Sequence, residues 1–533
     1  MIQMLQRWVA EHAQQRPEAT AMVLKGERMT YGRLEEISNQ LARMLIEGGC
    51  RRGDRVCLLL PKSTAAIAGI LGVLKAGCIY VPLDPSSPAV RLAKIVETCQ
   101  NRWILAGGSA SPLLKELAGN CGSGSAMRIG WLDECVEIDE NCKPAFSFAD
   151  LGTVSGEPLD AGNTASDPAY IMFTSGSTGS PKGVVITHSN VIHFVEWAVP
   201  CFDIRETDRL SCHSPLHFDL SVFDIFGAFA AGAELRLVTP ELNVLPNKLA
   251  DFIRDSSLTQ WFSVPSVLNH MAKFDVVKPN DFPALKRLLW CGEVLPVPVL
   301  TYFMKRLPHV TFTNLYGPTE ATIASSYYVL PGCPTDDRTA IPIGRPCGGE
   351  NLYVLDEKLR PVEAGEIGNL YIQGAGLSPG YYHNPEKTHE AFLRNPFSAD
   401  HSDRLYRTGD LAKVGEDGLI YFLGRLDSQI KSRGHRIELG EVSTALAALG
   451  FLRESAVVAI PTSGFEGVII CCAYVALPHR DVSPATLRSE LSKVLPRYML
   501  PTRWMAMHEL PKNANGKIDN RLVKEQFPSA ELI

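Results

Sequence analysis

Strand-type and helix-type segments alternate along the first half of the chain, and this alternation restricts the fold more than any other feature. Val56–Leu60 and Tyr80–Val81 have the composition of buried strands, and Thr64–Ala76 between them has a helical pattern. A repeated strand–helix–strand order is typical of parallel sheets covered by helices. We therefore expect an α/β fold. Because 533 residues exceed what one hydrophobic core usually holds, we also expect at least one smaller domain.

The composition excludes several classes of protein. Hydrophobic residues make up 45% of the chain and charged residues 21%, which is the balance of an ordinary globular protein. The formal net charge is −6 and the basic residues are scattered, so we expect no nucleic-acid partner. Met1–Arg16 has the pattern of an amphipathic helix with Trp8 and Val9 inward, and no apolar run reaches membrane-spanning length. These features predict a cytoplasmic protein without a membrane partner.

The 14 cysteines include no C-x-x-C pair. Since no secretion signal directs the chain to an oxidising compartment, we do not expect disulfides. The absence of paired Cys and His spacing also argues against a structural zinc site. Most of the thiols are therefore expected to be reduced and buried.

The pattern of predicted strands and helices changes after Asp410. Short strand candidates at Leu419–Leu423 and Gln429–Ser432 are followed by the helical stretch Leu439–Leu449. The regular alternation of the first half is lost here, which indicates a second domain. We place the boundary near Gly424–Asp427.

The most informative segment follows the apolar run Tyr170–Phe173. It reads TSGSTGSPKG over residues 174–183, with glycines that free backbone N–H groups, several hydroxyl side chains and the ammonium of Lys182. A polyphosphate is bound by groups of these kinds. The segment is not a Walker A loop, because Pro181 stands where that pattern requires glycine. A flexible surface loop would account for the composition, but not for its position between a buried strand and Lys182.

A second segment, Asn314–Glu320, is predicted to be a turn that holds an amide, an aromatic ring, a hydroxyl and a carboxylate within seven residues. These groups suit the adenine edge, the adenine face, a phosphate and Mg²⁺ respectively. Taken alone, a turn with a purely structural role explains the segment equally well.

Each of three further segments is, on its own, weak evidence for a nucleotide site. Tyr406–Asp410 and Gly424–Asp427 supply a carboxylate and a guanidinium of the kind that bind ribose hydroxyls, and Leu510–Asp519 places two lysines on a polar loop. Charged residues at such positions are usually only solvated. Their significance comes from the fact that all five segments occur in one chain and in one order.

Together the five segments resemble the superfamily of acyl-CoA synthetases, luciferases and peptide-synthetase adenylation domains, and specifically its amino-acid adenylation branch. The resemblance extends from about Leu5 to Leu522. It implies a large N-terminal domain of parallel sheets covered by helices, with a β-barrel-like subdomain, over residues 1–424. A hinge at 425–427 and a small, mobile α+β C-terminal domain at 428–533 would follow.

The resemblance implies that the chain binds ATP and Mg²⁺ and assigns the residues that do so. The phosphates would be bound by Thr174, Ser175, Gly176, Ser177, Thr178 and Lys182. The adenosine would be bound by Asn314, Tyr316, Gly317, Asp410 and Arg425. The catalytic set would be His217, Thr319, Glu320 and Lys517, with Glu320 as the Mg²⁺ ligand. After a rotation about the hinge residue Asp427, the face around 431–436 would meet the thiol of a carrier.

Amino-acid substrates are indicated by Asp219, which matches the aspartate that binds the substrate ammonium in that branch. A charge pair at ~4 Å contributes roughly 4 kcal/mol at an effective dielectric near 20. A fatty or aryl acid would leave this carboxylate unpaired. The other pocket positions carried over from the family are Leu220, Phe223, Ser263, Leu289, Cys291, Leu315, Ile323 and Ala324. None is charged and several are bulky, so we expect a small neutral amino acid: alanine, proline, glycine, serine or cysteine.

Several alternatives stay open. Leu289–Pro296 resembles the D-alanine–carrier ligases, and an acyl-CoA ligase of the same fold would release a soluble thioester. An inactive relative would have lost Glu320, Asp410 or Lys517, and all three are present. No carrier segment follows Lys517, so we expect the acceptor to be the phosphopantetheine thiol of a separate carrier protein. A small activator protein is a further candidate partner.

Overall fold

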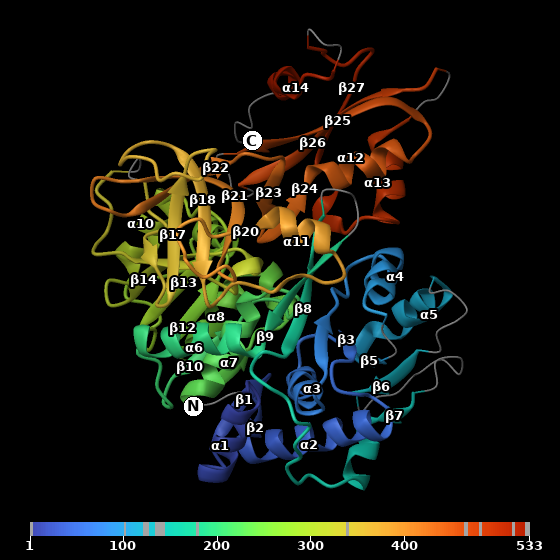
Figure 1. The fold of residues 1–533 in the computed structure, drawn as a ribbon, viewed down its shortest axis with the longest axis vertical. Helices are drawn as coiled ribbons and strands as arrows, with labels where there is room; N and C mark the ends of the chain where they lie inside the picture. The colour runs from blue at the N-terminus through green and yellow to red at the C-terminus, as the bar shows by residue number, and fades with distance from the viewer. Residues whose placement is uncertain are drawn as a thin grey trace.

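The computed structural model describes residues 4–100, 103–120, 127–133, 144–176, 181–336, 340–462, 467–478, 482–513 and 517–527. Two large sheets and the helices around them form the N-terminal part, and a smaller group of strands and helices lies above it in Figure 1. This arrangement confirms the expected α/β domain with a smaller C-terminal domain.

The nine-stranded sheet has the order β16-β15-β14-β13-β12-β10-β11-β1-β2. Its strands are β1 (Thr20–Leu24), β2 (Glu27–Thr30), β10 (Arg209–Cys212), β11 (Glu234–Leu237), β12 (Gln260–Ser263), β13 (Arg287–Cys291), β14 (Thr311–Tyr316), β15 (Ser326–Val329) and β16 (Arg345–Pro346). Six neighbouring strands, β14 to β1 in that order, are parallel, and antiparallel strands flank them at both edges.

The eight-stranded sheet has the order β19-β9-β8-β4-β3-β5-β6-β7. Its strands are β3 (Arg55–Leu59), β4 (Ile79–Pro82), β5 (Trp103–Ala106), β6 (Arg128–Trp131), β7 (Phe146–Ser147), β8 (Pro168–Thr174), β9 (Lys182–Thr187) and β19 (Gly380–Tyr381). Strands β3 to β8 pair in parallel, and β9 and β19 pair antiparallel. The strands expected at Val56–Leu60 and Tyr80–Val81 are therefore confirmed as β3 and β4.

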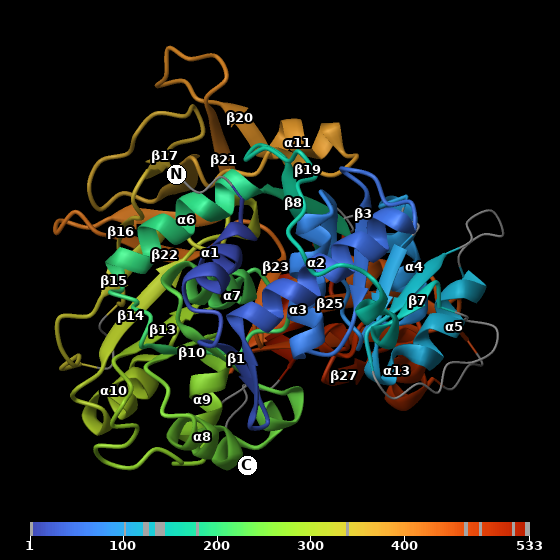
Figure 2. The ribbon, with the colours of Figure 1, turned by 90° about the horizontal axis from the view of Figure 1, so that it is seen from below.

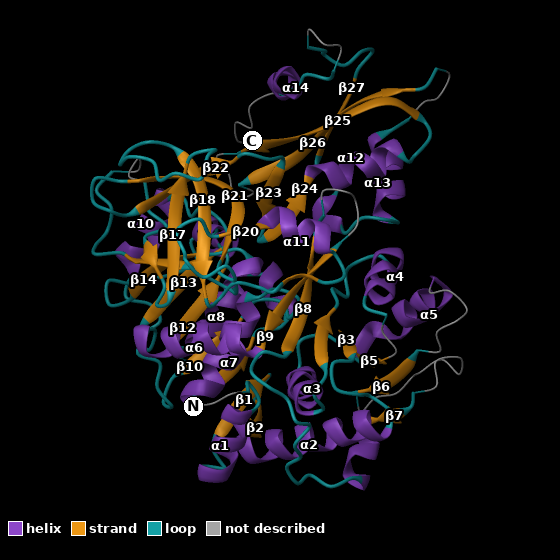
Figure 3. Cartoon of the chain, in the orientation of Figure 1, coloured by secondary structure: helices purple, strands orange, loops and turns teal. Residues whose placement is uncertain are grey.

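Helices lie between the two sheets and on their outer faces, which gives five layers (Figures 2 and 3). The helices of this domain are α1 (Arg7–Gln15), α2 (Tyr31–Glu47), α3 (Thr64–Lys75), α4 (Ala89–Thr98), α5 (Ser111–Asn120), α6 (His188–Cys201), α7 (Leu220–Ala231), α8 (Pro246–Asp255), α9 (Pro265–Lys273) and α10 (Val297–Arg306). The central layer contains α2, α3, α6 and α7. The outer layers are α4 and α5 on one sheet and α8, α9 and α10 on the other.

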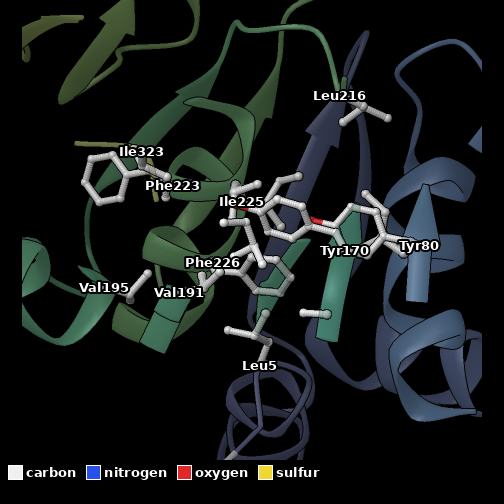
Figure 4. Packing of buried hydrophobic residues seen from close by; sticks show 14 of the residues in the cluster. Leu5, Tyr80, Tyr170, Val191, Val195, Leu216, Phe223, Ile225, Phe226 and Ile323 are labelled. Atoms are coloured by element: carbon white, nitrogen blue, oxygen red, sulfur yellow. The ribbon is translucent and has the colours of Figure 1, made fainter. Parts of the chain in front are cut away.

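The central layer explains the high apolar content of its helices. Every residue of α3 from Ala66 to Lys75 is buried, because sheets cover the helix on two sides. A helix that is apolar all round is typical of such a position. Figure 4 shows the same packing for α7, where Phe223, Ile225 and Phe226 belong to one cluster with Tyr170.

A five-stranded antiparallel sheet forms the last part of the N-terminal domain. It contains β17 (Glu350–Leu355), β18 (Gly368–Gly374), β20 (Phe392–Arg394), β21 (Arg404–Val414) and β22 (Ile420–Arg425), next to helix α11 (Pro385–Ala391). Register shifts in β18 and in β21 are irregularities of the kind that bend strands. This curved sheet is the expected barrel-like subdomain.

The C-terminal domain begins with a hairpin of β23 (Gln429–Ser432) and β24 (His435–Glu438). A three-stranded sheet follows, with β25 (Leu452–Pro461), β26 (Val468–Ala476) and β27 (Arg503–Ala506). Helices α12 (Leu439–Ala447) and α13 (Pro484–Ser492) cover one face, and α14 (Asn520–Gln526) covers the other. The domain thus has an α+β organisation with its own core.

The two parallel sheets bring the predicted site residues to one place. Ser263, Cys291 and Tyr316 end three adjacent parallel strands, and Thr174 ends β8 of the other sheet. Ligands of α/β proteins usually bind beyond the carboxyl ends of parallel strands. One prediction was wrong in detail: Asn314 lies within β14 rather than in a turn, because β14 pairs with β13 as far as Leu315 and the turn begins at Gly317.

No disulfide joins two of the eleven described cysteines, and nine of them are buried. No helix in the described part of the chain is long and apolar enough to cross a bilayer.

Gly344 lies where the nine-stranded sheet meets the five-stranded sheet, and a substitution at this position tests the architecture. It has φ +90°, its amide and carbonyl both bond to Ile420, and a Cβ placed there would lie 2.0 Å from the carbonyl oxygen of Tyr327. Gly344→Ala should therefore reduce the free energy of unfolding by about 1–3 kcal/mol and lower Tm in a thermal melt. Gly332→Ala is the control, because no atom lies within 4 Å of its added Cβ. Equal Tm values for the two variants would contradict the described junction.

Candidate active site

A cavity of about 140 Å³ lies between the two domains. Its wall is formed by the carboxyl ends of β8 and β13, the loop 217–220, the turn at Gly317–Thr319 and the hairpin β23–β24. Asp84, Arg91 of α4 and Tyr498 of the C-terminal domain also line the cavity. The site is therefore shared between the N-terminal and C-terminal domains.

Asp219 lies at the N-terminal end of α7 and faces the cavity. The residue is 7% exposed, and burial raises the pKa of its carboxyl to about 6. A hydrogen bond from Thr319 and the charge of Lys431 act in the opposite direction but do not offset the burial. A buried carboxylate facing a cavity is suited to a cationic group of a small ligand.

Glu320 is fully buried at the end of the turn after β14 and is surrounded by positive charge. Its Oε1 accepts a hydrogen bond from the hydroxyl of Tyr381 at 2.7 Å and lies 3.5 Å from the Nζ of Lys182. Its Oε2 accepts a hydrogen bond from the guanidinium of Arg436 at 2.8 Å. Burial opposes ionisation, but the charges of Arg436 and Lys182 hold the pKa of Glu320 well below its usual range.

The segment predicted to bind phosphates lies between β8 and β9. Thr174 and Ser175 line the cavity, and Lys182 begins β9 with its ammonium 4.6 Å from the ring centroid of Tyr381. Among the described residues, none bonds the buried hydroxyl oxygen of Thr174, whereas the hydroxyl of Ser175 donates to the carbonyl of Arg436 at 2.7 Å. Gly176 is buried beside them. Ser177 and Thr178 lie outside the described residues.

The predicted adenosine residues form one network. Asp410 accepts hydrogen bonds from the hydroxyl of Tyr316 and from the guanidinium of Arg425, and both Asp410 and Arg425 line the cavity. Arg425 also bonds both carboxylate oxygens of Asp427 at 2.8 Å, so the expected hinge residue adjoins this network. Asn314 lies behind the network, where its amide donates to the carbonyl of Pro342 at 2.8 Å.

Gly317 permits a close approach of two backbone segments at this edge. A Cβ at Gly317 would lie 2.5 Å from the Cα of Ala324. The following residues Thr322 and Ile323 have φ of 56° and 71°, which is rare for β-branched residues. Hydrogen bonds such as that from Thr322 Oγ1 to Gly376 at 2.6 Å hold this conformation. Strained backbone of this kind is often found at binding sites.

The predicted substrate residues divide into two groups. Asp219, Leu220 and Cys291 line the cavity, with Gly292 and Gly317 beside them. Six others are buried behind this wall: Phe223, Ser263, Leu289, Leu315, Ile323 and Ala324. Burial raises the pKa of the Cys291 thiol to about 12, which leaves it a neutral wall group.

The two remaining catalytic candidates lie in different places. His217 lines the cavity, and burial lowers the pKa of its imidazole. Lys517 is exposed on the C-terminal domain, where its amide bonds Asn513 next to the bridge between Lys512 and Ile518. The face that the hairpin β23–β24 presents to the cavity carries Lys431 and Arg436 instead.

Sequence reasoning missed several residues that the structure brings to the site. Tyr381 comes from the distant edge strand β19, and Arg91 of α4 forms a buried ion pair with Glu441 of α12 across the domain interface. Tyr498 lines the same cavity and stacks with ring centroids 3.6 Å apart on His435, which belongs to the face predicted at 431–436. Tyr498 itself was not predicted. None of these residues belongs to the five segments, and each is placed only by contacts between distant elements.

The comparisons with known proteins agree with this geometry. A family model of AMP-binding enzymes matches residues 9–382, and the model of the AMP-binding enzyme C-terminal domain matches residues 441–517. The chain belongs to the family of AMP-binding enzymes. Within that family it is an adenylation domain of the type found in nonribosomal peptide synthetases.

Three relatives illustrate this adenylation-domain assignment. Zwittermicin A synthase ZmaJ of Bacillus cereus is 34% identical over 97% of this chain and 94% of that protein. Tyrocidine synthase 3 of Brevibacillus parabrevis is 36% identical over 99% of this chain, which spans only 8% of that protein. The crystal structure of the Vibrio cholerae adenylation domain AlmE in complex with glycyl-adenosine-5'-phosphate is 26% identical, with a TM-score of 0.83 over 99% of this chain and 98% of AlmE.

The raised pKa of Asp219 has a consequence for stability. Between pH about 4 and about 6 the folded adenylation domain holds a proton on Asp219 that the unfolded chain has lost. The contribution of this group to the free energy of unfolding therefore falls as pH rises through that range and is lowest above about pH 6. Asp219→Asn should raise the Tm of the ligand-free protein at pH 8, by the equivalent of about 1–3 kcal/mol.

The same Tm comparison at pH 4.5 should show a much smaller difference, because Asp219 of the wild type is then protonated. Thermal melts of both proteins at the two pH values measure the effect. A variant that is less stable than the wild type at pH 8 would show that the carboxylate is already compensated by a cation of the protein.

Proposed function

We propose that this adenylation domain uses ATP to activate a small neutral amino acid and then transfers it to the phosphopantetheine thiol of a separate carrier protein. The observation that supports this most directly is the buried carboxylate of Asp219 in the cavity wall. The ammonium of an amino acid would be a cationic partner for this carboxylate. A fatty or aryl acid has no ammonium and would leave the carboxylate unpaired, at a cost of several kcal/mol.

The first half-reaction forms an aminoacyl adenylate. An oxygen of the substrate carboxylate attacks the α-phosphorus of ATP, and the bond to pyrophosphate breaks. Negative charge grows on the phosphoryl oxygens, which Thr319 and the ammonium of Lys517 would stabilise. Asp410 and Arg425 would hold the ribose, and Thr174, Ser175 and Lys182 would hold the leaving phosphates.

Mg²⁺ fits the chemistry of this site, although the described residues contain no group of three potential metal-ligating side chains. Glu320 offers one ionised, buried carboxylate, and the hydroxyl of Thr174 in the cavity wall has no bonding partner among the described residues. A metal held by one carboxylate and by substrate phosphates is the usual arrangement for this ion. When bound to Glu320, Mg²⁺ would supply positive charge for the phosphates of ATP and pyrophosphate.

The cavity favours the smallest members of the expected substrate class. It ends at Cys291 and Gly292, and the bulky residues Phe223, Leu289 and Leu315 are packed behind this wall. The thiol of Cys291 lies 4.0 Å from the carbonyl oxygen of Ile323, which leaves little room beyond. AlmE, whose fold is similar, holds glycyl-adenosine-5'-phosphate. We therefore place glycine and alanine ahead of serine, cysteine and proline.

The part of the cavity beside α4 suits the carrier's phosphopantetheine. It is lined by Arg91 of α4, by His217, and by His435 and Tyr498 of the C-terminal domain. An extended arm could enter there while the carrier itself stays outside. In the second half-reaction the carrier sulfur bonds to the acyl carbon, AMP leaves and the thiol proton passes to solvent or to the departing phosphate.

A screen of ATP–pyrophosphate exchange with all twenty amino acids and D-alanine tests the substrate proposal. We expect the highest kcat/KM for glycine or an alanine enantiomer and no exchange with leucine or phenylalanine. Asp219→Ala should lower kcat/KM for the preferred amino acid ~10²-fold or more, because the ammonium loses its counter-charge. Binding of ATP, measured separately by calorimetry, should be retained.

Two outcomes of this screen would contradict the proposal. Near-normal kcat/KM in Asp219→Ala would remove the amino-acid assignment. Activation of carboxylic acids without an amino group, with transfer to CoA rather than to a carrier, would favour the acyl-CoA ligase alternative.

Lys517→Ala should separate the two half-reactions. Lys517 is exposed and is not among the residues that line the cavity in this orientation, so we expect it to stabilise the first transition state only after the C-terminal domain has rotated about Asp427. Loss of one such electrostatic contact costs ~10²–10³ in rate. We expect pyrophosphate exchange to fall by that factor, while transfer from a supplied aminoacyl adenylate to the carrier thiol stays near the wild-type rate.

Lys512→Ala is the matched control for the Lys517 experiment, because Lys512 lies on the same loop and pairs with Glu454. Circular dichroism should show that both variants are folded. If the Lys517 variant retains exchange, or loses both half-reactions equally, the proposed rotation is wrong.

A further inference from the structure

Lys62 is a buried lysine that the proposed reaction does not use. It lies between β3 of the eight-stranded sheet and α3, and it is 9% exposed. Its Nζ donates hydrogen bonds to the carbonyl oxygens of Cys212 and His213, both at 2.6 Å. Cys212 ends β10 of the nine-stranded sheet, and His213 follows it. One side chain thus connects the carboxyl ends of strands from both parallel sheets.

The segment that begins at this contact is the recognition loop, which we define as residues 213–219. It joins β10 to α7 and brings His217 and Asp219 to the cavity wall. Inside the loop, the amide of Phe218 donates to the carbonyl of Pro215 at 3.0 Å. A bond within the loop shapes its turn but does not fix its position relative to the eight-stranded sheet. The bonds from Lys62 supply that connection.

The same lysine acts on the helix that follows the recognition loop. Asp224 lies on α7, five residues after Asp219, and has no exposed surface. Burial raises the pKa of the Asp224 carboxyl well above its usual range, and the charge of Lys62 acts in the opposite direction. Lys62 therefore interacts with the strand before the loop and with the helix after it.

The backbone at Lys62 is itself firmly held. The hydroxyl of Ser63 caps α3 by accepting the amide of Ala66 at 3.1 Å, and α3 is buried in the central layer from Ala66 onward. Pro61 precedes the lysine and restricts the backbone further. A donor fixed in this way can position a neighbouring segment, and its removal would leave two buried carbonyl groups short of a partner.

We propose that Lys62 is a positioning residue for the amino-acid site and holds the recognition loop so that the carboxylate of Asp219 faces the cavity. The inference rests on the proposed function, because it takes Asp219 as the group that binds the substrate ammonium. Lys62 is not among the residues that line the cavity, so it acts through the loop and not on the substrate. The amino-acid site is then assembled from both parallel sheets.

Lys62→Met tests this role, because methionine keeps the apolar length of the side chain and removes the donor. In ATP–pyrophosphate exchange, the KM for the preferred amino acid should rise by about 10- to 100-fold, since a displacement of ~1 Å at a recognition group has effects of this size. The KM for ATP should stay near the wild-type value, and kcat should change less than the KM for the amino acid. Lys62→Arg keeps donors at this position and should recover part of the lost affinity.

Lys75→Met is the matched control for a purely structural effect. Lys75 is a buried lysine in the last turn of α3, where it bonds Asn39 at 2.7 Å and pairs with Glu35 at 2.6 Å. Both methionine variants should lower Tm in thermal melts, but Lys75→Met should leave the KM for the amino acid unchanged. Hydrogen–deuterium exchange of residues 213–221 should be faster in Lys62→Met alone. If Lys62→Met does not fold, Lys62→Gln replaces it with the same expected direction.

The double variant Lys62→Met/Asp219→Ala distinguishes failure of this inference from failure of the proposed function. If Lys62 acts through Asp219, the second substitution should add little to the loss of kcat/KM caused by Asp219→Ala, whereas independent effects would multiply. Multiplied losses, or a KM in Lys62→Met no higher than in Lys75→Met, would overturn the positioning role and leave the amino-acid assignment standing. Near-normal kcat/KM in Asp219→Ala alone would overturn both.

Discussion

The active site depends on the contacts that compensate the buried negative charge of Glu320. Three elements that are distant in the chain supply its partners: Lys182 on β9, Tyr381 on β19 and Arg436 on β24. Removing a cationic partner would leave a charge without solvent, at a cost of several kcal/mol. The carboxylate thus connects the predicted nucleotide site, the edge of the eight-stranded sheet and the C-terminal domain.

The layered fold makes this convergence possible. Parallel strands present their carboxyl ends at one edge, and the two sheets of the N-terminal domain direct those edges toward the same cavity. Because α2, α3, α6 and α7 fill the space between the sheets, the strand ends are held rigidly. The C-terminal domain lies above the N-terminal domain in Figure 1, and its hairpin β23–β24 lines the cavity.

Several residues at the candidate binding site lower the stability of the ligand-free protein. Asp219 is buried with a raised pKa, and Thr322 and Ile323 hold backbone conformations that β-branched residues rarely adopt. Each of these features costs free energy in the ligand-free protein. A bound ammonium would compensate the buried carboxylate of Asp219. The unusual backbone of Thr322 and Ile323 accompanies the close approach of the chain at Gly317 to Ala324. Such local costs are common where function selects against the most stable arrangement.

The sequence by itself determined the fold class and the family, and it predicted many of the residues that line the cavity. Alternating strand and helix patterns predicted the parallel sheets, because burial on both faces requires continuous apolar runs. Four local segments predicted Thr174, Lys182, Glu320, Asp410 and Arg425, since each segment carries its chemistry within a few residues. Only the tertiary structure decided that Asn314 lies in a strand, because strand pairing is a contact between distant segments.

The tertiary structure also decided which pocket residues reach the cavity and which residues join the site from elsewhere. Phe223 and Leu315 match pocket positions in sequence but lie behind the wall, because packing of α7 and β14 sets the depth of the cavity. Tyr381 and the pair Arg91–Glu441 carried no local signal. Local sequence specifies the chemistry that a segment offers, whereas the partner of a buried charge is chosen by the assembly of sheets and domains around it.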